Sequence, residues 1–177
     1  MTTTDQTIDS SPILGDTHVT PNIGGSMETL FTRSSYPASK LIMAVTGEPM
    51  SHCAIKYGNL VLHCNFTGFQ IERYDDFLKH SIIVGTRKAG HSVPCSDILE
   101  VIRVNLGRRY DWKAFFYLGI RQILKSLGLP SPKVELTGIS GLYICTEFVY
   151  SVTIGKPDTL LTPYQLYMQL DTKDSES

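Results

Sequence analysis

Long hydrophobic runs, closely paired cysteines and an excess of either charge are all missing from this 177-residue sequence. Its apolar stretches are far too short to span a bilayer, so we expect no transmembrane segment. Sixteen basic residues stand against seventeen acidic ones, which gives a formal net charge of -1. The basic residues are scattered along the chain and do not form the run of positive charge that is typical of nucleic-acid binding. A nucleic-acid-binding role is therefore disfavoured.

The four cysteines show no Cys-X-X-Cys spacing. They fit neither a zinc ribbon nor a disulfide scaffold, and they indicate a reducing, cytoplasmic compartment. The opening segment MTTTDQTIDSS contains acidic residues and lacks a basic stretch followed by an apolar one. We therefore expect no secretory signal.

Composition and length predict one globular domain with two polar ends. Residues 1–28 are rich in Thr, Asp, Ser, Pro and Gly without periodicity, so we expect a disordered arm. Such an arm often folds on a protein partner. Residues 171–177, DTKDSES, predict a disordered tail. The folded domain is expected to span residues 29–170.

The positions of turn-forming residues along the chain predict short strands that alternate with helices, and hence a compact α+β fold. Helices are expected over residues 36–46, 112–127, 145–154 and from the Thr162-Pro163-Gln165 capping box onward.

In the first helix, Ser34 or Ser35 can form the cap, and the apolar residues, Leu41 among them, have the spacing of one buried face. Strands are expected over residues 81–86 and 100–104. The segment HCAIKYGNLVLHC predicts a β-hairpin with its turn near Tyr57-Gly58-Asn59.

Cys145 is the candidate nucleophile. It follows the short extended stretch 142–144 and opens a predicted helix, so the positive end of the helix dipole falls on its sulfur. A thiol of pKa ~8.5 must fall to ~6 to be mostly thiolate at pH 7, which requires about 3 kcal/mol. A helix terminus rarely supplies that much, so a histidine partner is required.

The hairpin can supply this histidine. With an even number of loop residues, His52 and His63 share one face, because side chains alternate along a strand. A Gly58-Asn59 turn places His52 opposite Asn65 and diagonal to His63, whereas a Tyr57-Gly58 turn places it opposite His63. Both registers stay open, and an odd loop would separate the two histidines.

Each of these catalytic interpretations has a structural alternative. A cysteine at such a junction is most often a small buried hydrophobe, and two histidines on one face are often a satisfied polar pair. The same parity sends Cys53 and Cys64 to the other face as a buried pair. A metal site that combines them with the histidines is disfavoured, because adjacent strand residues point in opposite directions. The stripe of Phe115, Leu118 and Ile123 predicts core packing.

Several segments in sequence order carry a resemblance to a known family. They are LFTRSSYPASKLIMAVTGEPMSHCAIKYG, NLVLHCNFTG, GRRYDWKAFFYLGI, YICTEFVYSV and LTPYQLY. Together they resemble the circularly permuted NlpC/P60 group of papain-like cysteine hydrolases, in particular its YiiX/YaeF-like branch. The resemblance covers roughly residues 29–170. The histidine precedes the cysteine here, as the permutation implies.

The resemblance implies a permuted papain-like fold in which a small antiparallel sheet packs against helices. It implies Cys145 as nucleophile, His52 as general base and His63 as the third, orienting residue, with Asn65 as the rival for that position. It also implies an oxyanion hole formed partly by the Cys145 N–H, with Tyr143 close to the site.

The expected function is a cysteine peptidase or amidase that cleaves a peptide or cell-wall amide through a thioester, with no metal or organic cofactor. A phage or bacterial setting, the virion included, is the usual one for such proteins. One alternative is a lipid-directed acyltransferase or thioesterase on the same residues, favoured if the helix 112–127 is exposed. Another is a catalytically silent structural module of a virion.

Overall fold

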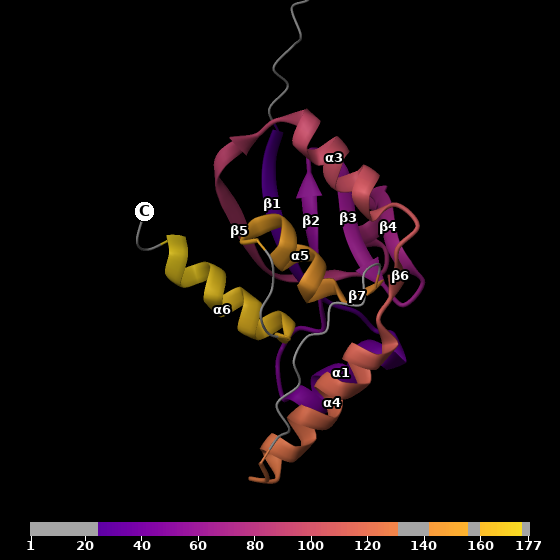
Figure 1. Cartoon of the computed structure of the whole chain (residues 1–177), viewed down its shortest axis with the longest axis vertical. Coiled ribbons are helices and arrows are strands. Elements are labelled where there is room, and N and C mark those ends of the chain that lie inside the picture. The colour runs from indigo at the N-terminus through magenta and orange to yellow at the C-terminus, as the bar shows by residue number, and fades with distance from the viewer. Residues whose placement is uncertain (1–24, 131–141, 156–159, 175–177) are drawn as a thin grey trace, which may run out of the picture.

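The computed structural model describes residues 25–130, 142–155 and 160–174 (Figure 1). The strands are β1 Gly25–Arg33, β2 His52–Tyr57, β3 Leu60–Asn65, β4 Gly68–Arg73, β5 Ile82–Val93, β6 Arg109–Tyr110 and β7 Leu142–Tyr143. The helices are α1 Pro37–Thr46, α2 Tyr74–Leu78, α3 Cys95–Asn105, α4 Trp112–Ser126, α5 Cys145–Thr153 and α6 Pro163–Asp174.

A five-stranded antiparallel sheet in the order β4-β3-β2-β1-β5 forms the centre of the fold. The helix α5 lies across one face of this sheet, over β2 and β3, and α6 packs beside it near β5 (Figure 1). The short strands β6 and β7 pair in parallel at one end of the molecule. The predicted α+β class, with a small antiparallel sheet packed against helices, is confirmed.

The register of the β2–β3 hairpin settles which turn is formed. Tyr57 pairs with Leu60 and Ile55 with Leu62, so the turn consists of Gly58 and Asn59. Gly58 has a φ of 58°, the left-handed conformation that such two-residue turns demand. The loop is even, and the two histidines therefore share a face, as the first of the two predicted registers requires.

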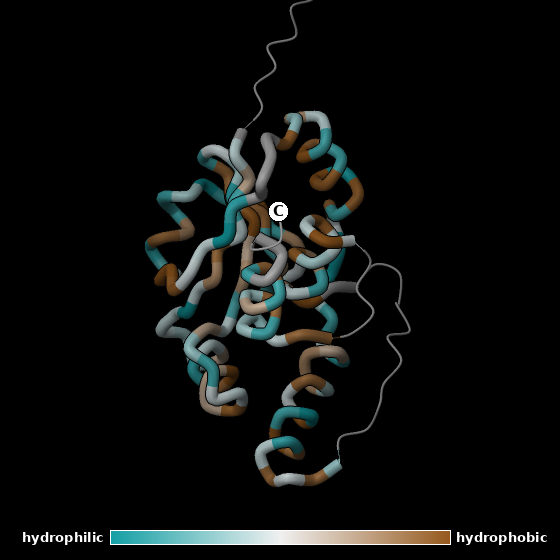
Figure 2. The backbone as a smooth tube through the Cα atoms, turned by 90° about the vertical axis from the view of Figure 1, so that its left-hand side faces the viewer, coloured by the Kyte–Doolittle hydropathy of each residue, from teal (hydrophilic) through white to brown (hydrophobic). Residues whose placement is uncertain are grey.

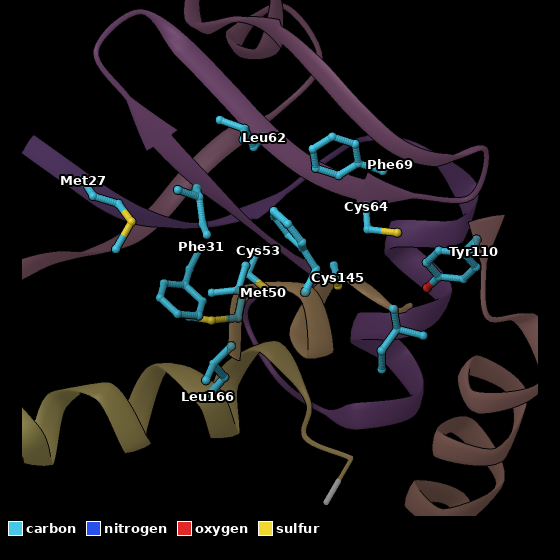
Figure 3. Close-up of a cluster of buried hydrophobic side chains, with 14 of the residues drawn as sticks. Met27, Phe31, Met50, Cys53, Leu62, Cys64, Phe69, Tyr110, Cys145 and Leu166 are labelled. Carbon is cyan, nitrogen blue, oxygen red and sulfur yellow. The ribbon is translucent and has the colours of Figure 1, made fainter. Parts of the chain in front are cut away.

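The two faces of the sheet are buried in different ways. The α5 face carries the main core, in which Phe31, Leu62 and Phe148 are fully buried together with two cysteines (Figure 3). The opposite face carries a smaller cluster in which Phe77 of α2 covers part of β1, β2 and β3. The strands β1, β2 and β3 thus alternate between two hydrophobic layers, which fixes their register.

One predicted strand is wrong. Residues 100–104 belong to α3, because the apolar side chains of this segment recur at helical spacing together with Ile98. Ile98 is buried, and Val101 and Ile102 pack on the core from the same helix face.

The secondary structure extends further toward both ends of the chain than predicted. The strand β1 begins at Gly25, with Met27 in the core, so residues 25–28 do not belong to the predicted arm. The helix α6 extends to Asp174, so residues 171–174 do not belong to the predicted tail. The rest of both predicted ends lies outside the described residues.

The first helix also differs from its prediction. Its N-cap is Tyr36, and neither Ser34 nor Ser35 caps it. Its only buried residue is Ser39, whereas Leu41 is exposed. The apolar pattern of this helix therefore does not produce a core-facing side. Gly47 ends the helix in the left-handed conformation.

Candidate active site

Cys145 is the first residue of α5 and is buried, with 7% of its surface exposed. The extended residues of β7 deliver the chain to this point, and Ile144 is the N-cap. The Glu147 carboxylate accepts a hydrogen bond from the Ile144 N–H at 3.1 Å, which stabilises the first turn. N–H groups of a first helical turn, that of Cys145 included, have no acceptor within the helix.

Two neighbours act on the Cys145 sulfur. The pKa of Cys145 lies well below its usual range, mainly because the Cys53 side chain donates a hydrogen bond to the sulfur. The charge of His52 and a hydrogen bond from it lower this pKa further, whereas burial acts in the opposite sense. Burial raises the pKa of Cys53 well above its usual range, so Cys53 keeps its proton and can donate it. The site therefore favours a thiolate on Cys145.

His52 and Cys145 meet at the end of the sheet. Cys53 and Cys64 lie in the core on the α5 face, as the strand parity predicts, and Cys145 lies with them (Figure 3). The imidazole of His52 belongs to the other face, but β2 begins at this residue, so the imidazole lies at the end of the strand. Here the sulfur on one face can reach the imidazole of the other.

A chain of polar side chains extends from His52 across the second face. His52 Nε2 lies 3.0 Å from His63 Nδ1, and His63 Nε2 lies 2.8 Å from Glu72 Oε1. This last contact is off the direction of a well-formed hydrogen bond, so its attraction is mainly that of a charge for a nearby N–H. The other Glu72 oxygen lies 3.0 Å from His80 Nε2.

The proton positions follow from these contacts. Burial, followed by the nearby His52 and His80, lowers the pKa of His63 to about 3, whereas the Glu72 carboxylate acts in the opposite sense. His63 is thus neutral at pH 7. A hydrogen on Nε2 faces Glu72, and Nδ1 then accepts from His52 Nε2. The other ring nitrogen of His52, Nδ1, remains to exchange a proton with the thiol.

Asn65 lies at the end of β3 and lines the same cavity as His52 and Cys145, but its side chain is bonded locally. Its Oδ1 accepts hydrogen bonds from the Thr67 N–H at 2.9 Å and from the Thr67 hydroxyl at 2.6 Å, which form the turn into β4. The structure thus brings His63, and not Asn65, into contact with His52. The backbone of Tyr143 lies in β7 beside Tyr110, while its side chain is outside the described residues.

A cavity of about 670 Å³ opens onto these residues. Its walls come from α1, from the ends of β2 and β3, from the β3–β4 turn and from α2. Cys145, His52, His63 and Glu72 all line it, together with the aromatic rings of Phe66 and Tyr110. A substrate bound here would meet the sulfur and the imidazole from one side.

The negative charge on the Cys145 sulfur raises the pKa of two neighbouring groups. Burial raises the pKa of Glu147 to about 6. The hydrogen bond from the Ile144 N–H opposes this rise, and the negative charges of Asp111 and Cys145 add to it. Burial and the neighbouring Cys145 raise the pKa of Tyr110 well above its usual range. Tyr110 therefore keeps its hydroxyl proton beside the site.

Sequence reasoning missed Glu72, His80 and Tyr110 as site residues. The signal for Glu72 was available in principle, because Gly68–Arg73 forms a second hairpin strand in which Glu72 pairs with Val61 and Gln70 with His63. Side chains of that strand alternate in the same way, which places Glu72 on the His63 face. His80 and Tyr110 come from segments whose positions no local pattern specifies.

Comparison of the chain with family models, curated proteins and solved structures found no match. Within the described residues, no three His, Cys, Asp or Glu side chains are grouped so as to hold a metal ion. None of the helices in that part of the chain has the length and apolarity needed to cross a bilayer.

Proposed function

We propose that the chain is a cysteine hydrolase with a permuted papain-like fold. The observation that carries this proposal is the arrangement around Cys145, a thiol at a helix N-terminus with a depressed pKa and a histidine beside it. A buried structural cysteine needs neither. Cys53 and Cys64 illustrate the contrast, because burial raises the pKa of both thiols.

In the proposed reaction the Cys145 sulfur attacks the carbonyl carbon of an amide, and a tetrahedral oxyanion forms. The Cys145 N–H at the start of α5 donates to this oxyanion. The C–N bond then breaks, and the leaving amine takes a proton from His52. Water next attacks the thioester, His52 accepts its proton, and the carboxylic acid is released with the thiol regenerated.

His63 and Glu72 are positioning residues in this scheme. His63 holds the ring of His52 through its Nδ1, and the Glu72 carboxylate lies behind it. A positive charge that develops on His52 during proton transfer is stabilised through this line of groups. This arrangement corresponds to that of a catalytic triad, in which the third group orients the base and stabilises its charged form.

The proposal is tested with three families of activated probe: peptide, cell-wall fragment and acyl ester. Each is incubated with the full chain, and the mass of the Cys145 peptide is read for an acyl adduct. The Cys145→Ala variant and the exposed thiol Cys95 are the controls. An adduct confined to Cys145 supports the proposal. Adducts on Cys95 alone, or none with any probe, contradict it.

A second candidate is transfer of a fatty acyl group on the same residues. The observation in its favour is the apolar rim of the cavity, where Phe66 stacks on Trp112 of α4 with ring centroids 5.0 Å apart. An acyl chain bound in the cavity could continue along this rim. The same probes separate the two functions, because long-chain esters should acylate Cys145 faster than peptides if the substrate is a lipid.

A further inference from the structure

Two thiols from distant parts of the chain, Cys53 of β2 and Cys145 of α5, are in contact within the core. The Cys53 side chain donates a hydrogen bond to the Cys145 sulfur, and the Cys53 backbone is bonded to the same sulfur. The helix α5 packs directly on β2, which brings the two residues together (Figure 3). The reaction proposed above forms bonds at Cys145 and gives Cys53 no bond-forming role.

The two thiols differ in their access to the cavity. Cys145 lines the cavity, whereas Cys53 is fully buried in the core. A small oxidant that enters the cavity therefore meets the Cys145 sulfur first. This sulfur is also the more reactive one, because its pKa is lowered and thiolate is the form that peroxides oxidise.

A third thiol, Cys64 of β3, belongs to the same core cluster and also lines the cavity. Burial and then the charge of Cys145 raise the pKa of Cys64 to about 12. Both neighbours of Cys145 are therefore protonated, and the negative charge rests on Cys145. The hydrogen bond from Cys53 makes it the better placed of the two to form a bond with the Cys145 sulfur.

We infer that Cys145 and Cys53 form a reversible redox site, in which a hydroperoxide oxidises Cys145 and Cys53 then closes a disulfide on it. The Cys145 thiolate attacks the terminal oxygen of the hydroperoxide, so an S–O bond forms and the O–O bond breaks. Cys145 is oxidised to a sulfenic acid, and the peroxide is reduced to an alcohol or water whose oxygen takes a proton from His52. The Cys53 sulfur next attacks the sulfenic sulfur, and the hydroxide leaves as water with the Cys53 proton.

The first step favours the second. After burial, the hydrogen bond and the charge of Cys145 are the causes that raise the pKa of Cys53. A sulfenic acid is neutral, so its charge no longer opposes ionisation of Cys53, whereas burial still does. Contact compensates for burial, because a group held against its target reacts as if at very high concentration. An S–S bond is ~2.05 Å long, so thiols already in hydrogen-bond contact need only a small further approach.

The disulfide protects the Cys145 sulfur. A sulfenic acid without a neighbouring thiol is oxidised further to a sulfinic acid, which thiols do not reduce. A dithiol reductant reopens a disulfide and returns the thiolate. That this step switches an enzymatic activity off and on rests on the proposed function, whereas formation of the disulfide requires only the reactive thiolate.

The test treats the folded full chain with hydrogen peroxide at pH 7. Remaining thiols are blocked under denaturing conditions, and tryptic peptides are mapped without reduction. Cleavage after Lys and Arg places the four cysteines on four different peptides, so each possible linkage has its own mass. We expect one linkage within the chain, between the Cys53 and Cys145 peptides, and its reversal by dithiothreitol. The exposed Cys95 reports general oxidation.

Two variants of Cys53 test its role. Cys53→Ser keeps a hydroxyl that can donate to the Cys145 sulfur, whereas Cys53→Ala removes the donor. In both variants the sulfenic acid should persist, so dimedone should label Cys145 at least about tenfold more than in the parent. Longer exposure should give a sulfinic acid that dithiothreitol does not restore.

The matched control is Cys64→Ser, because Cys64 is an equally buried thiol of the same cluster. This variant should form the Cys53–Cys145 disulfide as the parent does. Melting temperatures show whether each variant is folded. The linkage in the parent and in Cys64→Ser decides the question even if both Cys53 variants are unstable.

Three outcomes overturn the inference. They are no linkage of Cys145 in the oxidised parent, linkage of Cys145 to Cys64 or Cys95, and linkage between two chains on a non-reducing gel. The acyl-probe experiment separates this inference from the hydrolase proposal. A disulfide without any acyl adduct contradicts only the hydrolase, and an acyl adduct without the disulfide contradicts only the redox site.

Discussion

His52 Nε2 and His63 Nδ1 lie 3.0 Å apart with their rings nearly perpendicular, at an interplanar angle of 77°. The contact is diagonal across the β2–β3 hairpin, so it depends on the two-residue Gly58-Asn59 turn. It joins an imidazole at the edge of the cavity to one that is buried. The inner ring, held between Glu72 and Phe77, gives the outer ring a fixed orientation.

The first prediction concerns the pH at which Cys145 reacts. Thiolate is the species that is alkylated, so Cys145 should reach half its maximal iodoacetamide labelling rate at a pH well below the usual pKa of a thiol. The exposed Cys95 is the reference thiol. His52→Ala removes a positive neighbour and should move the Cys145 midpoint upward. Peptide mass mapping over pH 5–9 reads both thiols in one sample. Midpoints are compared because burial slows the absolute rate at Cys145.

Equal midpoints for Cys145 and Cys95 in the parent protein would remove the basis of the hydrolase proposal. An unchanged midpoint in His52→Ala would exclude His52 as the partner of the thiol and leave the Cys53 hydrogen bond as the cause of the low pKa.

The second prediction separates the two candidates for the third site residue. His63→Asn should lower the esterase rate on p-nitrophenyl acetate by about tenfold or more, because His52 loses the group that orients it. Asn65→Ala should leave that rate within about twofold and cost about 1 kcal/mol of stability, since it removes hydrogen bonds of a turn. Rates are corrected with Cys145→Ala, and stability is read from urea unfolding. The reverse pattern of rates would place Asn65 in the role.

The third prediction concerns Glu72. In Glu72→Gln the imidazolium of His52 loses a distant negative charge, so the basic limb of the kcat/KM profile should move to lower pH. The rate at pH 7 should fall by about tenfold with little change in KM. Glu28→Gln is the matched control, because Glu28 is similarly exposed and also contacts two basic side chains, Lys56 and Lys88. A merely structural Glu72 would lower stability and leave the profile in place.

The fourth prediction concerns stability and pH. The pKa of Glu147 is raised to about 6 in the folded protein from an ordinary 4.5, so the folded state binds the proton more tightly than the unfolded chain. This favourable contribution is complete below about pH 4.5 and is lost as the pH rises through 6. Glu147→Gln keeps an oxygen for the Ile144 N–H and should stabilise the protein at pH 8 by about 1 to 2 kcal/mol.

Thermal unfolding at pH 4 and pH 8 measures this effect, since about 1 kcal/mol corresponds to a few degrees for a domain of this size. The gain should vanish at pH 4. Glu100→Gln is the control of opposite sign, because Arg103 lowers the pKa of Glu100 on the surface. A gain of equal size at both pH values would show that ionisation of Glu147 is not its cause.

The sequence was informative wherever a local rule determines the structure. The Thr162 capping box and the start of α5 depend on residues within one turn of each other, and both were predicted. The Gly58-Asn59 turn was one of the two registers that the sequence left open. Strand parity then placed the histidines together. These steps need only alternation and capping chemistry.

The rest depends on long-range packing. Hydrophobic positions recur along the whole length of α4 (Figure 2). Phe115 and Leu118 pack on the core, as predicted, whereas Ile123 of the same predicted stripe is exposed. Ile123 and the exposed Leu41 follow the helical spacing of a buried face, and only the absence of a covering element among the described residues distinguishes them. The Cys53 thiol beside Cys145 depends on how α5 crosses the sheet. Periodicity identifies an apolar face, whereas tertiary structure determines what that face meets.

The order of the elements along the chain has a consequence for synthesis. The strands β1 to β4, with the proposed base His52, are complete by residue 73, whereas α5, which covers their main hydrophobic face, begins 93 residues after His52. Until the ribosome has passed Cys145, the emerging sheet exposes side chains such as Ile55 and Leu62 that the finished protein buries completely. A nascent chain in this state is open to aggregation and to chaperone binding. The proposed nucleophile and the cover of the sheet are synthesised together, because Cys145 is the first residue of α5.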